Sequence, residues 1–205
     1  MNFASDNVTG MAPEILEALA AANKGAAMPY GEDALTPRLE IRLAEVFERE
    51  VAVLPVATGT AANALGLSAL VPPYGAIYCH REAHIYENEA GAAEFYCGGA
   101  RLVPLPGDHG KLEAATLAEA IPAAPDVHNP QPAAISITQA SEAGTLYALE
   151  EIAAIAEVAR ARGLALQMDG ARFANAVAAL GCSPAEASWK AGVEVLALGA
   201  TKNGC

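Results

Sequence analysis

Hydrophobic positions along the chain alternate between two spacings, one typical of helices and one typical of buried strands. In five segments, apolar side chains recur every three or four residues, which predicts amphipathic helices. The last of these segments is the clearest and ends at Gly163, a residue type that commonly follows a helix. The predicted helices are 12–24, 37–49, 61–70, 112–121 and 148–162.

Short apolar runs between these helices have the length of strands. The predicted strands are 51–57, 77–79, 101–105, 133–138, 164–169 and 193–200. Four prolines between 122 and 132 indicate a surface connection before one of them. Strands that alternate with helices are typical of an α/β fold with a mostly parallel sheet flanked by helices. With no internal repeat and no low-complexity linker, we expect one domain over 1–205.

Composition narrows the class of protein. The chain has 205 residues, 24 acidic and 12 basic, for a net charge of −12. This charge argues against nucleic acid or an anionic membrane as a partner. No apolar run is long enough to span a bilayer, and the first residues do not resemble a signal peptide. Four scattered cysteines suggest reduced thiols, no metal site and a cytoplasmic protein.

Ligands of parallel sheets bind beyond the carboxyl ends of the strands, so the residues just after each strand matter most. Thr58, Gly59 and Thr60 stand between a predicted strand and a predicted helix. A glycine turn at a helix N-terminus offers free N–H groups and a positive dipole end, which suit a phosphate. The alternative is that Thr58 caps an ordinary helix.

Two further candidates come after later strands. Asp169 ends one strand and could hold a protonated ring nitrogen, and Arg172 could bind a phosphate or carboxylate as a fork. The alternative is a surface Asp–Arg pair. Lys202 comes after the last strand between glycines and could form a Schiff base, or it could be a solvated loop lysine. Together, these three groups are the attachments that pyridoxal phosphate requires.

The residues resemble the threonine aldolase family of fold-type-I pyridoxal-phosphate enzymes, within the β-eliminating lyase group. The combination of GTxAN, DGAR and a TKNG lysine is specific, and TKNG resembles the low-specificity branch. The matching stretches, in the family's order, are FASDN (3–7), PYGED (29–33), ATGTAAN (57–63), AHIYENEAG (83–91), MDGARFANAV (168–177) and GATKNGC (199–205).

The resemblance implies the large, cofactor-binding domain of an aspartate aminotransferase-like fold, with an N-terminal arm of about 1–36. It implies that Lys202 bonds the cofactor, that Asp169 pairs with its ring nitrogen, and that His84 stacks on the ring. Thr58, Gly59 and Thr60 would hold the phosphate. The resemblance also implies that Arg172 and Ser5 help to bind the substrate carboxylate. His128 is placed near the substrate hydroxyl, and Tyr30, Glu87 and Glu89 match weaker positions.

The activity implied is aldol cleavage of L-threonine or L-allo-threonine to glycine and an aldehyde, with His128 or His84 as the base. Another lyase, racemase or aminotransferase on the same fold stays open. A truncated, non-catalytic cofactor-binding fragment and a nucleotide-binding or interaction domain without catalysis also stay open. Where many members carry Asn-Thr-His, this chain has Thr138-Gln139-Ala140-Ser141. The resemblance also implies a further small C-terminal domain and a dimer of dimers, so we expect weak activity from these 205 residues alone.

Overall fold

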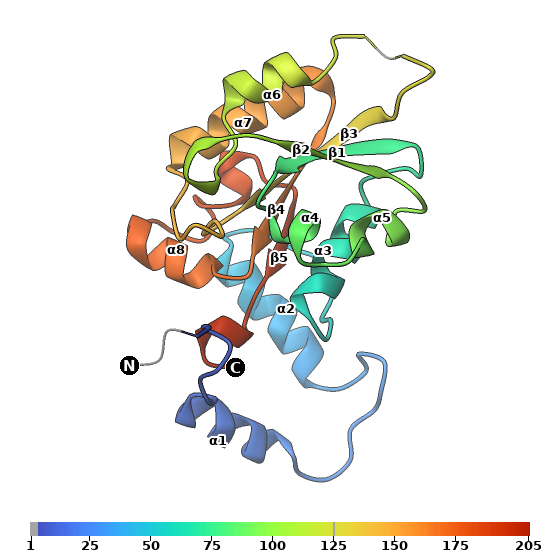
Figure 1. Ribbon diagram of the computed structural model, residues 1–205. Helices are drawn as coiled ribbons and strands as arrows, with labels where there is room; N and C mark the ends of the chain where they lie inside the picture. The colour runs from blue at the N-terminus through green and yellow to red at the C-terminus, as the bar shows by residue number, and fades with distance from the viewer. Residues whose placement is uncertain (1–3, 125) are drawn as a thin grey trace.

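A computed structural model describes residues 4–124 and 126–205. Its centre is a five-stranded sheet in the order β2-β1-β3-β4-β5, in which every neighbouring pair is parallel (Figure 1). Long-range parallel pairing with helical crossovers is the α/β architecture that the alternating pattern predicts. The strands are β1 (Gly75–His80), β2 (Arg101–Leu105), β3 (Gln131–Thr138), β4 (Ala165–Gly170) and β5 (Val195–Leu198).

Helices bury both faces of this sheet. On one face, Tyr78 of β1 and Ile135 of β3 pack in a cluster that includes Leu117 and Ile155 from two crossover helices. On the other face, Ile77 and its neighbours pack against a second group of helices. The first group is α6 (Ala114–Ala120), α7 (Leu149–Arg162) and α8 (Phe173–Leu180), and the second is α3 (Gly59–Ser68), α4 (His84–Glu87) and α5 (Ala92–Tyr96).

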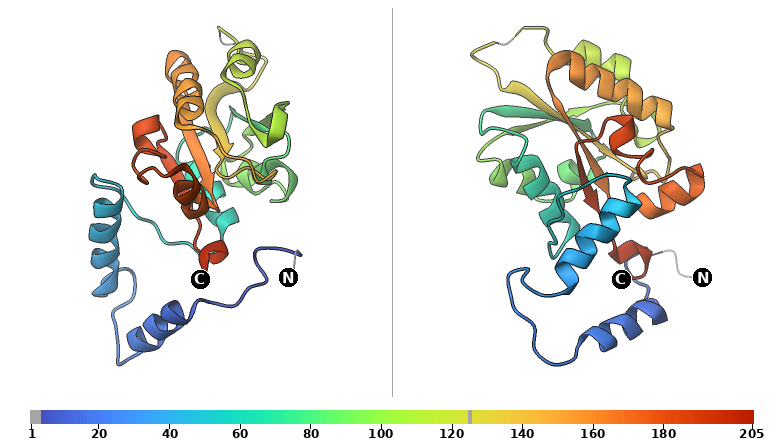
Figure 2. Two further views of the ribbon diagram at one scale, coloured as in Figure 1. Left: turned by 90° about the vertical axis from the view of Figure 1, so that its left-hand side faces the viewer. Right: turned by 180° about the vertical axis from the view of Figure 1, so that it is seen from behind.

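Two helices at the start of the chain lie outside this core. They are α1 (Pro13–Ala22) and α2 (Leu35–Val46), and neither contains a buried residue. Figure 2 shows from two sides that α1 and the loop after it extend away from the sheet. Leu16, Leu19 and Ile41 are consequently exposed, although their spacing is that of a helix with a buried face. The spacing predicted the helices correctly. On α2, Leu43 and Val46 are half-buried and pack against the core, while the exposed apolar side chains of both helices have no cover within the described chain.

The predicted strand at 51–57 is wrong. This apolar segment has no regular secondary structure, and Leu54 is 86% exposed. A strand needs a neighbour to complete its backbone hydrogen bonds, and among the described residues 51–57 have no ladder partner. Helices α4, α5 and α8 were not predicted, since they are short. In residues 4–124 and 126–205 no helix is both long and apolar enough to cross a membrane.

Candidate active site

The ends of β4 and β5 approach each other so closely that only glycine fits at two positions. The N–H of Gly199 donates to the carbonyl oxygen of Gly170 at 3.0 Å. A Cβ at Gly199 would lie 2.6 Å from Ala171 backbone atoms, and one at Gly170 would lie 2.9 Å from the Ala197 carbonyl oxygen. This contact brings the residues after the two strands, including Lys202, to one edge of the sheet.

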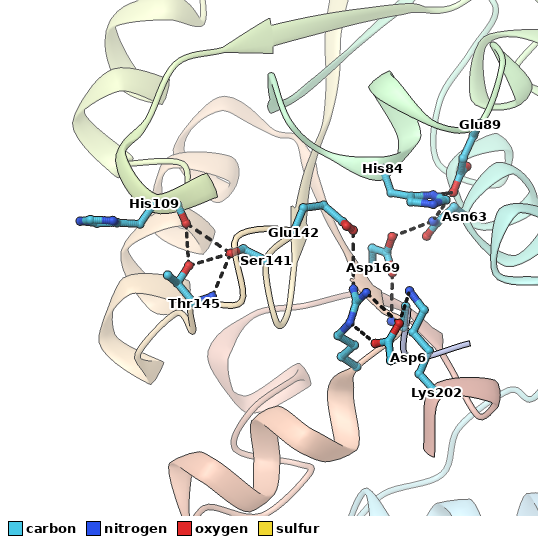
Figure 3. Close-up of polar contacts among 12 residues, drawn as sticks. Asp6, Asn63, His84, Glu89, His109, Ser141, Glu142, Thr145, Asp169 and Lys202 are labelled. Carbon is cyan, nitrogen blue, oxygen red and sulfur yellow. Dashed lines mark hydrogen bonds and ion pairs between the residues drawn. The ribbon is translucent and has the colours of Figure 1, made fainter. Parts of the chain in front are cut away.

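Asp169 is a buried carboxylate at this edge, with only 4% of its surface exposed. Its Oδ2 accepts a hydrogen bond from Asn63 Nδ2 at 2.9 Å, and its Oδ1 accepts from the N–H of Ala171 at 3.0 Å (Figure 3). The donors aimed at both oxygens hold the Asp169 carboxyl group in a fixed orientation.

A second buried carboxylate lies on the other side of Asn63. Glu89 Oε1 accepts from Asn63 Nδ2 at 3.0 Å and lies 2.9 Å from His84 Nδ1. Its Oε2 is buried and has no hydrogen-bond partner in the described chain. Burial raises the pKa of Glu89, although the bonds from Asn63 and His84 oppose that rise. His84, at the start of α4, is thereby oriented by Glu89.

Arg172 and Lys202 face a carboxylate that comes from the start of the chain. Arg172 Nε donates to Asp6 Oδ2 at 2.6 Å, and Lys202 Nζ lies 3.9 Å from Asp6 Oδ1. The bond from Arg172 lowers the pKa of Asp6. Glu142 Oε1, from the turn after β3, lies 3.8 Å from Arg172 Nη1, which has no hydrogen bond among the described residues. Figure 3 shows these charged groups converging beside Asp169.

The glycine turn at the start of α3 has backbone N–H groups that donate no hydrogen bond within the described structure. Thr58 is the N-cap, and its Oγ1 accepts from the N–H of Ala61 at 3.1 Å. Within the described structure, the N–H groups of Gly59 and Thr60 donate no hydrogen bond, and a Cβ at Gly59 would meet open space. The capping alternative thus holds for the Thr58 side chain, while free donors remain beside it for an anion.

Not every residue named from the sequence comes to this edge. His128 is exposed in the loop before β3, whereas Thr138, which pairs with Asp169, ends that strand. An eight-residue strand spans about 23 Å, so the structure leaves His128 at the opposite end of the sheet. Tyr30 is 99% exposed in the loop between α1 and α2.

Two further candidates, Glu87 and Ser5, make no contact with the charged groups of the site in the described structure. Glu87 is an exposed residue at the end of α4. Ser5 precedes Asp6, and its Oγ accepts from the N–H of Asn7 at 3.1 Å.

Four residues of the site were not selected from the sequence: Asp6, Asn63, Glu142 and Gln167. Asp6 and Asn63 stand inside the FASDN and ATGTAAN motifs, so the signal was present. Nothing in the sequence indicates that Glu142 contacts Arg172.

An α/β sheet with a lysine, a buried carboxylate and a glycine turn at its carboxyl edge defines a cofactor-dependent class of enzyme fold. Comparison with known families is consistent with this class. The chain belongs to the beta-eliminating lyase family, whose model matches residues 2–205.

Individual members of the family that are similar to this chain are named as threonine aldolases. The chain is 45% identical over 202 residues to a low specificity L-threonine aldolase of Pseudomonas aeruginosa, covering 98% of this chain and 58% of that protein. It is 34% identical over 181 residues to one of Saccharomyces cerevisiae, covering 86% and 46%. A solved Leishmania major threonine aldolase superposes with a TM-score of 0.89 at 29% identity, covering 98% and 58%. The chain thus spans about half the length of these relatives.

Proposed function

We propose that this chain is the cofactor-binding part of a pyridoxal-phosphate-dependent lyase that cleaves L-threonine and L-allo-threonine to glycine and acetaldehyde. The observation that carries the proposal is the convergence of Asp169, Arg172 and Lys202 with the start of α3. Asn63, on α3, bonds Asp169, and Asp6 joins Arg172 to Lys202. The names of the most similar relatives support the substrate class.

The residues present fit this cofactor. The free N–H groups of Gly59 and Thr60 would hold its phosphate. Asp169, held in a fixed orientation by two donors, would pair with its protonated ring nitrogen. Lys202 would supply the amine that bonds it. When bound, the cofactor supplies an electron sink that accepts the pair of electrons left by bond cleavage.

The chain's own residues would bind and orient the substrate. Arg172, whose Nη1 makes no hydrogen bond among the described residues, can donate two hydrogen bonds to the substrate carboxylate once Asp6 moves aside. Holding that carboxylate would fix the orientation of the bonds at Cα, so Arg172 would select Cα–Cβ cleavage. His84 would take the proton of the β-hydroxyl, because Glu89 holds Nδ1 and leaves Nε2 as the free ring nitrogen. His128 is not proposed as the base.

Product analysis tests the proposal. The chain with pyridoxal phosphate and threonine should release glycine and acetaldehyde in equal amounts. Pyruvate and ammonia from serine would instead assign a β-elimination. A colourless protein that binds no pyridoxal phosphate would overturn the proposal and favour a non-catalytic nucleotide-binding domain.

We further propose that the protein acts in the cytoplasm as a homo-oligomer, specifically a dimer of dimers. The support is the uncovered apolar side chains of α1 and α2, including Leu16, Leu19 and Ile41. Sedimentation of the chain at several concentrations tests this assembly, and a monomer at every concentration would contradict it.

A further inference from the structure

A chain of buried polar side chains connects the middle of the sheet to Asp169. Ser136 Oγ donates to Gln167 Oε1 at 2.5 Å, and Gln167 Nε2 donates to Asn63 Oδ1 at 3.0 Å. Asn63 Nδ2 then donates to both Asp169 and Glu89. None of these five side chains belongs to a residue more than 4% exposed, so water does not complete their hydrogen bonds. We call Ser136, Gln167 and Asn63 the amide relay.

The amide relay has one favourable direction. Both hydrogens of Asn63 Nδ2 are donated to carboxylate oxygens, and its Oδ1 accepts a hydrogen bond from Gln167. A reversed Asn63 would point an amide oxygen at two carboxylates and its NH₂ group at Gln167 Nε2. Buried polar groups left in such contacts are costly, and acceptors facing acceptors repel. Gln167, held by Ser136, therefore keeps Asn63 donating toward Asp169.

We propose that Asn63 is a positioning residue, locked as a double donor by Gln167 and Ser136, that holds the Asp169 carboxylate in the orientation required by the ring nitrogen. The inference rests on the proposed function for the identity of that nitrogen. It also links Asp169 to the Glu89–His84 pair, because the two carboxylates share one NH₂ group. Gln167 contacts neither carboxylate. Replacing it should nevertheless alter the position of Asp169, because Gln167 holds Asn63 and Asn63 holds Asp169.

The other charged groups around Asp169 stay in place in such variants. From the elements packed around it these are His84 and Glu89 on the α4 side, Arg172 after β4, Lys202 after β5, Glu142 after β3, and Asp6 of the N-terminal segment. Gln167→Met alters none of these groups directly, so a change in the Asp169 carboxyl resonance reports the loss of the relay hydrogen bond, whereas Asn63→Leu also removes the donor to Glu89.

The first test needs no cofactor. Carboxyl-detected NMR of the chain at a fixed pH would record the carboxyl resonance of Asp169 in wild type, Asn63→Leu and Gln167→Met. Losing or weakening the hydrogen bond from Asn63 Nδ2 changes the surroundings of that carboxyl carbon, so its resonance should move in both variants. Methionine matches glutamine in length, which keeps Gln167→Met packed if Asn63→Leu fails to fold.

Gln139→Met is the matched control. Gln139 is as buried as Gln167 and also makes two side-chain hydrogen bonds, but both go to the backbone of Tyr147. Both glutamine variants should lose stability, and only Gln167→Met should move the Asp169 carboxyl resonance. An unchanged resonance in folded Gln167→Met, or an equal change in Gln139→Met, would overturn the proposal.

A second readout separates this inference from the proposed function. The dissociation constant of pyridoxal phosphate should rise about 10-fold or more in Asn63→Leu, since bonds to charged groups are the strong ones. Gln167→Met should raise it by a smaller factor, and Gln139→Met should not. If wild type bound no pyridoxal phosphate while the Asp169 carboxyl resonance still responded to Gln167→Met, the proposed function would fail and the positioning role of Asn63 would stand.

Discussion

Arg172 Nε donates a hydrogen bond to Asp6 Oδ2 at 2.6 Å across 166 residues of sequence. The carboxylate of Asp6 also faces Lys202, so one acidic side chain sits between the two cations assigned to substrate and cofactor. Asp6 therefore competes with any other carboxylate for the guanidinium N–H groups of Arg172. Asp6 of the N-terminal segment therefore contacts both cations, and we expect it to limit how readily Arg172 accepts another anion.

Replacing Asp6 should strengthen anion binding. In Asp6→Asn the fork of Arg172 loses its charged partner, and a partly exposed ion pair is worth about 0.5–1 kcal/mol. The dissociation constant of threonine should therefore fall about two- to fivefold in a spectroscopic titration, with a smaller effect at high salt. Asp108→Asn makes the same charge change at an exposed residue of another loop and should leave the constant unchanged. Weaker threonine binding in Asp6→Asn would show that Asp6 assists the substrate.

The stability of the chain should fall as pH rises because of Glu89. Its folded-state pKa is raised by burial, so between the ordinary value of 4.5 and the raised value the folded state holds more protons than the unfolded state. The free energy of unfolding then decreases with pH across that window. Urea unfolding of wild type and Glu89→Gln should show this loss in wild type alone. Glu87→Gln, at an exposed glutamate, should behave as wild type does, and parallel curves for Glu89→Gln would contradict the assignment.

Lys202 should be the point of covalent attachment. Lys202→Ala should abolish the visible absorbance of lysine-bound pyridoxal phosphate and should prevent its fixation by borohydride. Lys24→Ala, at an exposed lysine after α1, is the control and should retain both. A visible band that survives in Lys202→Ala, or mass-spectrometric labelling at another lysine, would show that the assignment is mistaken.

Replacing His84 and replacing His128 should have different effects on the rate of threonine cleavage. His84→Phe keeps an aromatic ring but removes the nitrogens, and loss of a general base costs about 10²- to 10⁴-fold in rate. Threonine cleavage should fall by that factor, while the affinity for pyridoxal phosphate changes little. His128→Phe should cleave threonine as wild type does, because His128 lies beyond the amino end of β3. A large loss of activity in His128→Phe would instead show that the loop before β3 reaches the active site.

The sequence by itself determined the parallel α/β class, most helices, and the Thr58–Thr60, Asp169 and Lys202 candidates, because each depends on local periodicity or on position at the end of a strand. Only the tertiary structure decided that residues 51–57 form no strand, since pairing needs a neighbour in space. It likewise decided that Asp6 reaches Arg172 and that Asn63 joins Asp169 to Glu89. These contacts span many residues, and hydrogen-bond partners at such separations leave no periodic trace in the chain.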